Sequence, residues 1–260
     1  MKVFDLITFS GEYDLLEVRF NILRDVVDKF IICEMPETFS GLPKPLYWIE
    51  RDRDRFEEWE HKVIHLTATY GEDQMIMEMM RDRPYVDQLP FRKAFYQKEF
   101  LRTALKDAED DDVIIYGDAD EIINPERVKD AQDQPYKLRQ LAYSYFLNNR
   151  SEEDWRGTVM TTYRTLKSRC LNDLRAYPEK IMEDGGWHWT NLGGLEAIRQ
   201  KIASYDHQEV NVPFVTEGLA ERMRLNVDFL GRGYNMWVSE DGLPDYILKN
   251  KARYDHLWKF

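Results

Sequence analysis

The chain of 260 residues has little cysteine and no long apolar run. Its two cysteines, Cys33 and Cys170, indicate neither a disulfide framework nor a zinc site. The N-terminus lacks the apolar core of a signal peptide, and no stretch is long and apolar enough to span a bilayer. Basic residues are outnumbered by acidic ones, 36 to 48, which gives a net charge of −12. We therefore expect a cytoplasmic protein without a transmembrane segment, and one that does not bind nucleic acid.

Apolar residues make up 43% of the chain and aromatic residues 13%, which indicates a globular protein with a sizeable core. Over residues 1–123, short apolar runs typical of buried strands alternate with helical patterns, as in a βαβ sheet. Residues 124–260 are richer in Trp and Tyr and predict a smaller mixed β region, with a helix over 243–260. Because no repeat or linker is visible, the sequence predicts one α/β domain with a mostly parallel, Rossmann-like sheet flanked by helices.

The segment Val113 to Glu121 carries the strongest functional signal, because four β-forming residues end abruptly at a cluster of carboxylates. Side chains alternate along an extended backbone, so Asp118 and Asp120 would point the same way. Two carboxylates aimed at one point repel each other unless a cation lies between them, and hard oxygen ligands suit Mn²⁺ or Mg²⁺. The segment therefore predicts a metal that grips a diphosphate. The alternative is a solvated acidic turn, which we expect for Glu109 to Asp112 just upstream.

Binding sites in such sheets lie beyond the carboxyl ends of the strands, where the pattern places Phe9, Glu34 and Asp118. The preceding helix carries basic residues, one of which is expected to face a diphosphate unless all lie on a solvated face: Arg92, Lys98 and Arg102. Residues 185–194 are rich in glycine and aromatics. This segment predicts a loop that approaches a ligand closely and stacks on sugar rings, or a tight turn with structural tryptophans.

The segment Phe9 to Arg19 resembles the opening motif of glycosyltransferase family 17, the family of the β-1,4-mannosyl-glycoprotein 4-β-N-acetylglucosaminyltransferases. The resemblance continues, in the right order, through 26–34, 38–46, Asp118–Ile122, Gly186–His188, Gly193–Gly194 and Lys201–Glu209. It implies a GT-A fold, with 1–123 as the half that binds the nucleotide-sugar donor and 124–260 as the half that binds the acceptor. It also implies UDP-GlcNAc as the donor, a glycan or glycoconjugate as the acceptor and inversion at the anomeric carbon.

The resemblance to GT-A enzymes implies that Asp120 coordinates the metal directly and that Asp118 contacts the metal or the ribose. It also implies a further ligand from the C-terminal half, for which His188 and His207 are the candidates. We favour His188 because of its Gly-Trp neighbourhood. The nucleotide and the loops around it are expected to involve Phe9, Glu12, Glu34, Lys44, Arg102 and Asp118.

Inversion by a single displacement needs one carboxylate base near the acceptor hydroxyl. The candidates are Glu196, Glu209 and Asp184, and the sequence does not choose among them. Glu196 has an alternative role as a first-turn acid at a helix N-terminus.

Two other functions compete with the transferase. Haloacid-dehalogenase-type phosphohydrolases also place Asp-x-Asp after an apolar strand, but usually near the N-terminus, whereas here the motif lies at mid-chain. A non-catalytic carbohydrate-binding protein would use the aromatic residues and would need neither the Asp pair nor a metal.

Overall fold

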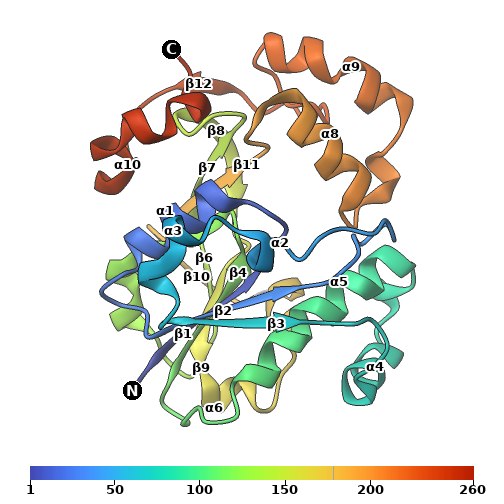
Figure 1. Cartoon of the computed structure of the whole chain (residues 1–260), viewed down its shortest axis with the longest axis vertical. Helices are drawn as coiled ribbons and strands as arrows, with labels where there is room; N and C mark the ends of the chain where they lie inside the picture. The colour runs from blue at the N-terminus through green and yellow to red at the C-terminus, as the bar shows by residue number, and fades with distance from the viewer. Residues whose placement is uncertain (178) are drawn as a thin grey trace.

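Two β-sheets organise the computed structural model, which describes residues 1–177 and 179–260 (Figure 1). The strands of the larger sheet are, in spatial order, β10 (Lys180–Met182), β6 (Tyr136–Leu138), β9 (Val159–Thr162), β4 (Val113–Asp118), β1 (Val3–Thr8), β2 (Lys29–Glu34) and β3 (Val63–Thr67). Strands β1 to β4 run parallel, whereas β9 is antiparallel to β4 and β6. The predicted α/β class, parallel in its N-terminal part and mixed beyond it, is confirmed.

The smaller sheet comes mainly from the second half of the chain. Its strands are, in spatial order, β12 (Met236–Val238), β8 (Asn149–Trp155), β7 (Gln140–Ser144), β11 (Gly186–Thr190) and β5 (Glu121–Ile123). Five residues of the predicted loop 185–194 therefore form a strand. The alternating tryptophans explain the difference, because Trp187 and Trp189 stack on one face of β11 with ring centroids 6.1 Å apart.

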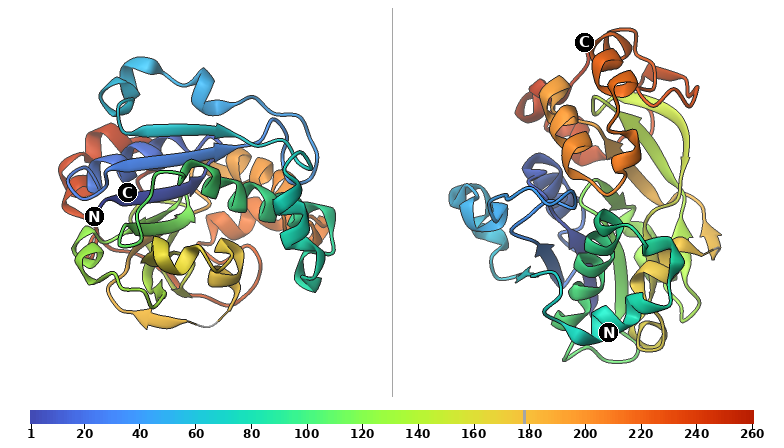
Figure 2. Two further views of the ribbon diagram at one scale, coloured as in Figure 1. Left: turned by 90° about the horizontal axis from the view of Figure 1, so that it is seen from below. Right: turned by 90° about the vertical axis from the view of Figure 1, so that its right-hand side faces the viewer.

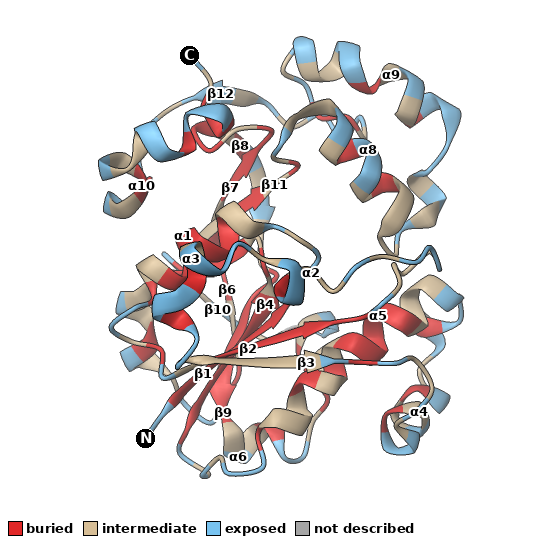
Figure 3. Ribbon diagram, viewed as in Figure 1, coloured by how far each residue is buried: buried red, intermediate tan, exposed pale blue. Residues whose placement is uncertain are grey.

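The two faces of the larger sheet bury separate apolar clusters, because side chains alternate along its strands. On β1, Val3 and Ile7 join the cluster of helix α1 (Tyr13–Ile22), while Phe4 and Leu6 join the opposite cluster. Three helices cover that opposite face: α4 (Gln74–Arg81), α5 (Leu89–Phe100) and α7 (Leu171–Ala176). Figure 3 shows β1, β2, β4 and β9 as mostly buried, whereas the edge strand β3 is only partly buried.

The C-terminal part caps the end of the molecule farthest from the N-terminus (Figure 2). Helices α8 (Gly194–Ser204) and α9 (Pro213–Arg224) share a small apolar cluster with residues of the smaller sheet region. The predicted helix over 243–260 is shorter: α10 (Asp245–Lys249) ends at Asn250 and the 3-10 segment η6 (Lys251–Leu257) follows. No helix in the described part of the chain is long and apolar enough to cross a membrane.

Short helices complete the fold: α2 (Tyr47–Glu50), α3 (Arg53–Phe56), α6 (Tyr163–Leu166), η1 (Glu57–Trp59), η2 (Pro84–Val86), η3 (Leu101–Ala104), η4 (Pro125–Asp130) and η5 (Gln208–Val210). The two predicted halves are interleaved, because β9, β6 and β10 extend the larger sheet beyond β4. In turn, β5 from the first half forms an edge of the smaller sheet. The link between β4 and β5 therefore lies where the two sheets meet.

Candidate active site

A tight turn at Ala119 and Asp120 joins β4 to β5. The neighbouring strand β11 holds this turn, since the Trp189 amide donates to the Asp120 carbonyl at 2.9 Å and His188 pairs with Glu121. The chain thus turns where the sequence analysis assumed an extended backbone. As a result, the carboxylates of Asp118 and Asp120 have different partners.

Asp118 is held by the larger sheet and by cations around it. Its Oδ1 accepts a hydrogen bond from Thr8 Oγ1 at 2.5 Å, and its Oδ2 accepts one from Arg175 Nη2 at 2.7 Å. Lys98 Nζ lies 4.0 Å from Oδ1. Burial alone would raise the pKa of Asp118, but Arg175, Lys98 and the Thr8 hydrogen bond outweigh it and hold the pKa well below its usual range.

Asp120 faces the smaller sheet and α8. Its Oδ2 lies 3.7 Å from His188 Nε2 and 3.4 Å from Lys201 Nζ. Burial opposes ionisation, but Lys201 and His188 lower the pKa of Asp120 to about 2, so the carboxylate is charged at neutral pH. The His188 ring is fixed by Trp155, which stacks on it at 4.0 Å between centroids and 15° between planes.

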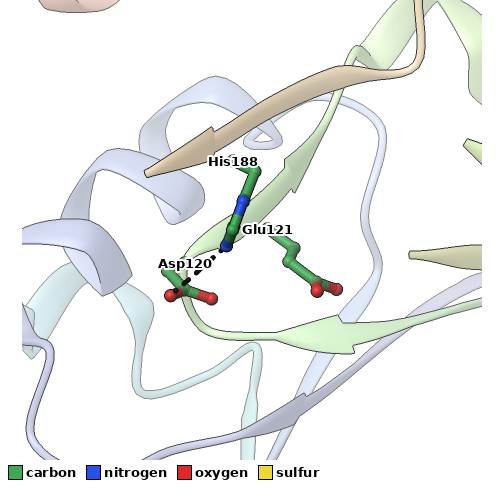
Figure 4. Close-up of side chains that lie close together, drawn as sticks. All are labelled: Asp120, Glu121 and His188. Carbon is green, nitrogen blue, oxygen red and sulfur yellow. Dashed lines mark ion pairs between the residues drawn. The ribbon is translucent and has the colours of Figure 1, made fainter. Parts of the chain in front are cut away.

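Ligand atoms of Asp120, Glu121 and His188 lie within 4.8 Å of one another (Figure 4). In Figure 4 the His188 ring reaches toward Asp120, while the Glu121 carboxylate lies off to one side. The oxygens of Glu121 already accept hydrogen bonds from Trp155, Thr158 and Arg175. Asp120 and His188 are therefore the better ligands for a metal ion.

The Asp120–His188 pair fits a divalent ion. Its two facing atoms are 3.7 Å apart, which is too long for a hydrogen bond, so neither satisfies the other. Among the described residues, His188 Nδ1 is also buried without a hydrogen-bond partner. A carboxylate and an imidazole aimed at the same space are common donors to a divalent metal.

Arg19 fixes the backbone of the turn from beneath. This fully buried side chain pairs with Asp5 through Nε and Nη2, at 2.7 and 2.6 Å. Its Nη1 donates to the carbonyls of Asp118 and Glu121, at 2.8 and 2.7 Å. This role of Arg19 was not predicted from the sequence, although Asp5 inside the apolar run 3–7 is a visible signal that a buried cation must face it.

Arg175, on the short helix α7, fixes the same turn through side chains. It binds both oxygens of Glu121, at 2.8 and 2.6 Å, as well as Asp118. These two carboxylates raise the pKa of Arg175 despite its burial, so it is a permanent cation. Nothing in the local sequence of α7 marks this arginine, because its partners are 54 and 57 residues away.

Glu12 lies at the mouth of the site, in the loop between β1 and α1. Its Oε2 accepts a hydrogen bond from the Ser10 amide at 2.8 Å, and its side chain is exposed. The pKa of Glu12 is raised because the surrounding protein displaces water and because Asp120 repels its charge, although Lys201 acts in the opposite direction. Glu12 therefore belongs with Asp120 and Lys201 in one electrostatic group.

The profile of glycosyltransferase family 17 matches residues 1–224. The chain belongs to glycosyltransferase family 17. Curated relatives are the β-1,4-mannosyl-glycoprotein 4-β-N-acetylglucosaminyltransferases of Rattus norvegicus and Homo sapiens, each 32% identical over 133 residues. These matches cover 46% of this chain but only 21% and 22% of the relatives.

Among solved structures, the 2-C-methyl-D-erythritol 4-phosphate cytidylyltransferase of Francisella tularensis aligns with 70% of this chain and 90% of its own. Its TM-score of 0.35 and identity of 11% are too low to support an argument. The family assignment itself makes this chain a glycosyltransferase, an enzyme that uses a sugar donor and an acceptor. It decides against the phosphohydrolase and the non-catalytic binding protein.

Several residues that the sequence analysis placed near the nucleotide have structural partners in this family 17 glycosyltransferase. Glu34 is fully buried and accepts hydrogen bonds from the amides of Tyr47 and Trp48 at the start of α2. It also contacts His65 at 3.0 Å and Lys44 at 3.7 Å. Burial lowers the pKa of Lys44, although the nearby Glu34 carboxylate acts in the opposite direction, so this lysine serves mainly as the counter-ion of a buried carboxylate.

Phe9 and Arg102 are also engaged by the fold. Phe9 is buried in the cluster that includes α1, edge-to-face with Tyr13 at 5.6 Å. Arg102 donates to the carbonyls of Leu166 and Arg169 and so ties η3 to the end of α6 and the residues after it. Of the three basic residues on the predicted helix, Lys98 is the one that reaches the Asp118 carboxylate.

The three candidates for the base lie on separate surface features. Glu196 is exposed on α8, about 140° around the helix from Lys201. Glu209 is exposed on η5 and pairs with His207 at 2.6 Å. The partner of His207 is therefore Glu209 and not a carboxylate of the Asp120 turn. Asp184 contacts Asn124 at the end of β5 opposite to Glu121. The choice of base stays a prediction.

Proposed function

We propose that this enzyme is a metal-dependent inverting glycosyltransferase that moves GlcNAc from UDP-GlcNAc to a hydroxyl of a glycan or glycoconjugate. The Asp120–His188 pair at the junction of the two sheets carries this proposal. It offers two ligands to one ion, at the carboxyl end of a parallel sheet. The donor sugar is inferred from the activity of the related N-acetylglucosaminyltransferases, and the fold would be of the GT-A type.

The charges around the turn suit a diphosphate. Lys98, Arg175 and Lys201 surround Asp118 and Asp120, although the chain as a whole carries a net charge of −12. A local group of cations reverses the field where an anionic donor must bind. We propose that residues 1–123 supply most of the donor site and residues 124–260 most of the acceptor site, with His188 and Lys201 reaching across.

Asp120 and His188 would hold the metal, which would neutralise negative charge on the leaving diphosphate. An imidazole makes the donor set softer than an all-oxygen set, which favours Mn²⁺ over Mg²⁺. Arg175 would keep Asp118 ionised and in place beside the metal site. Arg19 would keep the turn in the shape that aims Asp120 at His188.

Calorimetric titration with UDP and UDP-GlcNAc, in Mn²⁺ and in EDTA, tests this proposal. The wild-type protein should bind both nucleotides in Mn²⁺ and neither measurably in EDTA. Asp120→Asn should lose most of the Mn²⁺-dependent affinity, because it removes the ligand charge while keeping the side-chain shape.

Asp25→Asn is the matched control, since Asp25 is exposed at the far end of α1 and should leave binding unchanged. Equal binding in Mn²⁺ and EDTA would refute the metal dependence. Binding of UDP without UDP-GlcNAc would refute the choice of donor sugar. Unchanged binding by Asp120→Asn would refute the role of the turn.

A further inference from the structure

The ammonium group of Lys201 lies beside the Asp120 carboxylate, where the proposed metal would bind. Its Nζ lies 3.4 Å from Asp120 Oδ2, the same oxygen that faces His188. It also donates to Thr190 Oγ1 at 2.9 Å, at the end of β11. An ammonium group therefore stands beside the pair of ligands that the proposed metal needs.

The contact between the Lys201 ammonium and the Asp120 carboxylate is favourable for both groups. The carboxylate of Asp120 attracts the ammonium of Lys201 across 3.4 Å, and the charges of Glu12 and Asp118 act on it in the same direction. In return, Lys201 is the largest favourable influence on the Asp120 carboxylate. Lys201 therefore offsets the negative charge of Asp120, as Arg175 and Lys98 offset that of Asp118.

Lys201 is the most exposed of the three cations around the turn. Its side chain is 40% exposed, compared with 14% for Lys98 and 17% for Arg175. Arg175 is also locked by paired hydrogen bonds to Glu121, whereas Lys201 has a flexible four-carbon stem with a compact charge. The ammonium of Lys201 can thus leave Asp120 without breaking a buried network.

The backbone beneath Lys201 is fixed. The Ser40 amide donates to the Ser204 carbonyl at 3.3 Å, and Ser40 Oγ donates to the Ala203 carbonyl at 2.7 Å. These contacts tie the C-terminal turn of α8 to the loop after β2. Movement of the Lys201 charge is therefore confined to the side chain.

We propose that Lys201 is the resident counter-ion of Asp120 in the free enzyme, is displaced from it by the divalent metal, and then binds the diphosphate of the donor. The inference rests on the proposed function. A dication at Asp120 repels the ammonium, and the nearest new anion is the diphosphate that the metal brings. Lys201 thereby opposes binding of the metal alone and supports binding of the metal together with a nucleotide.

Lys201→Met tests the exchange with a readout other than activity. Binding of Mn²⁺ alone is followed by the electron paramagnetic resonance signal of the free ion, and binding of UDP by calorimetry at saturating Mn²⁺. Loss of a positive charge about 4 Å from the ion should tighten Mn²⁺ binding by about fivefold or more. The same variant should bind UDP about tenfold more weakly.

Two further variants separate exchange from a structural role. Lys201→Arg should restore UDP binding, because it restores the charge. Arg199→Met, on an exposed part of the same helix, should change neither affinity. Thermal unfolding of each variant checks that α8 remains folded.

The outcomes distinguish this inference from the proposed function. If the wild type binds Mn²⁺ and UDP, but Lys201→Met binds Mn²⁺ with equal or lower affinity, the exchange is overturned and the metal-dependent function stands. If the wild type binds UDP equally well in EDTA and only Lys201→Met loses it, the lysine replaces the metal and both proposals are overturned. If the wild type binds neither Mn²⁺ nor UDP, the proposed function itself fails.

Discussion

Replacing Arg175 with methionine tests whether the turn is held by its buried charges. Arg175→Met keeps much of the side-chain volume but removes the cation that Glu121 and Asp118 share. Glu121 is fully buried and would keep only neutral donors, namely Trp155, Thr158 and the Asp118 amide. The variant therefore leaves a carboxylate inside the protein without its counter-ion.

The expected loss of stability is large. Removing one partner of a buried ion pair typically costs about 3–5 kcal/mol. Asp118 is 33% exposed, so water screens part of its share, and we expect about 3 kcal/mol at neutral pH. Most of this loss would come from Glu121.

The loss should depend on pH in one direction. In the wild type, the folded-state pKa of Asp118 is lowered, chiefly by Arg175 against the effect of burial. Ionised Asp118 therefore stabilises the fold above its unfolded pKa of about 3.9, and this contribution fades as the pH falls below that value. Because Arg175→Met removes the largest cause of the lowering, the gap between wild type and variant should narrow from pH 5 to pH 3.

Urea unfolding followed by tryptophan fluorescence measures both effects. The slope of the unfolding free energy against urea should be the same in both proteins. Arg164→Met is a suitable control, because Arg164 pairs with Asp110 and Asp111 at the surface, and its unfolding midpoint should hardly change. A loss below about 1 kcal/mol for Arg175→Met, or a gap that widens as the pH falls, would refute this account of the turn.

Two further substitutions test the supports of the same turn. Arg19→Met should destabilise the protein by about 3–5 kcal/mol, because Asp5 stays buried without a cation, and adding Asp5→Leu should recover part of the loss in urea unfolding. Full stability of the single variant would contradict this. Gly186→Ala should cost at least about 2 kcal/mol, because φ is +116° and a Cβ would lie 2.2 Å from the Ile122 carbonyl oxygen. Gly71→Ala has a similar φ of +92° with nothing within 4 Å, so its melting temperature should fall less, and equal losses would show that crowding is not the cause.

The sequence predicted the fold where local pattern and burial agree. The alternation of apolar runs and helical patterns predicted over residues 1–123 corresponds to strands β1 to β4 of the larger sheet and to helices such as α1 and α5. The smaller sheet was harder to predict, because its short strands mix glycine, tryptophan and charged residues. Their pairing depends on partners elsewhere in the chain, as for β11, which is flanked by β5 and β7.

The candidate site was likewise predicted only in part from the sequence. Asp120 and His188 come together as the sequence motifs indicated, because each follows or lies on a strand at the sheet junction. The turn at Ala119 overrides strand alternation, so Asp118 takes Thr8 and Arg175 as partners. Long-range partners of this kind, Arg175 above all, leave no trace in the spacing of a single sequence.

The position of β4 has a consequence for the order in which the chain can fold during synthesis. Strands β1, β2 and β3 can pair as soon as residue 67 is made, but the other edge of β1 stays open until β4 follows some 110 residues after its partner. The other edge of β4 then waits for β9, and the turn at Asp120 waits for β11. Such distant pairing makes folding slow and leaves sheet edges exposed to other chains. A nascent chain that stalls just before residue 186 contains every strand of the larger sheet and the turn at Asp120, but it lacks β11 and α8 and with them His188 and Lys201.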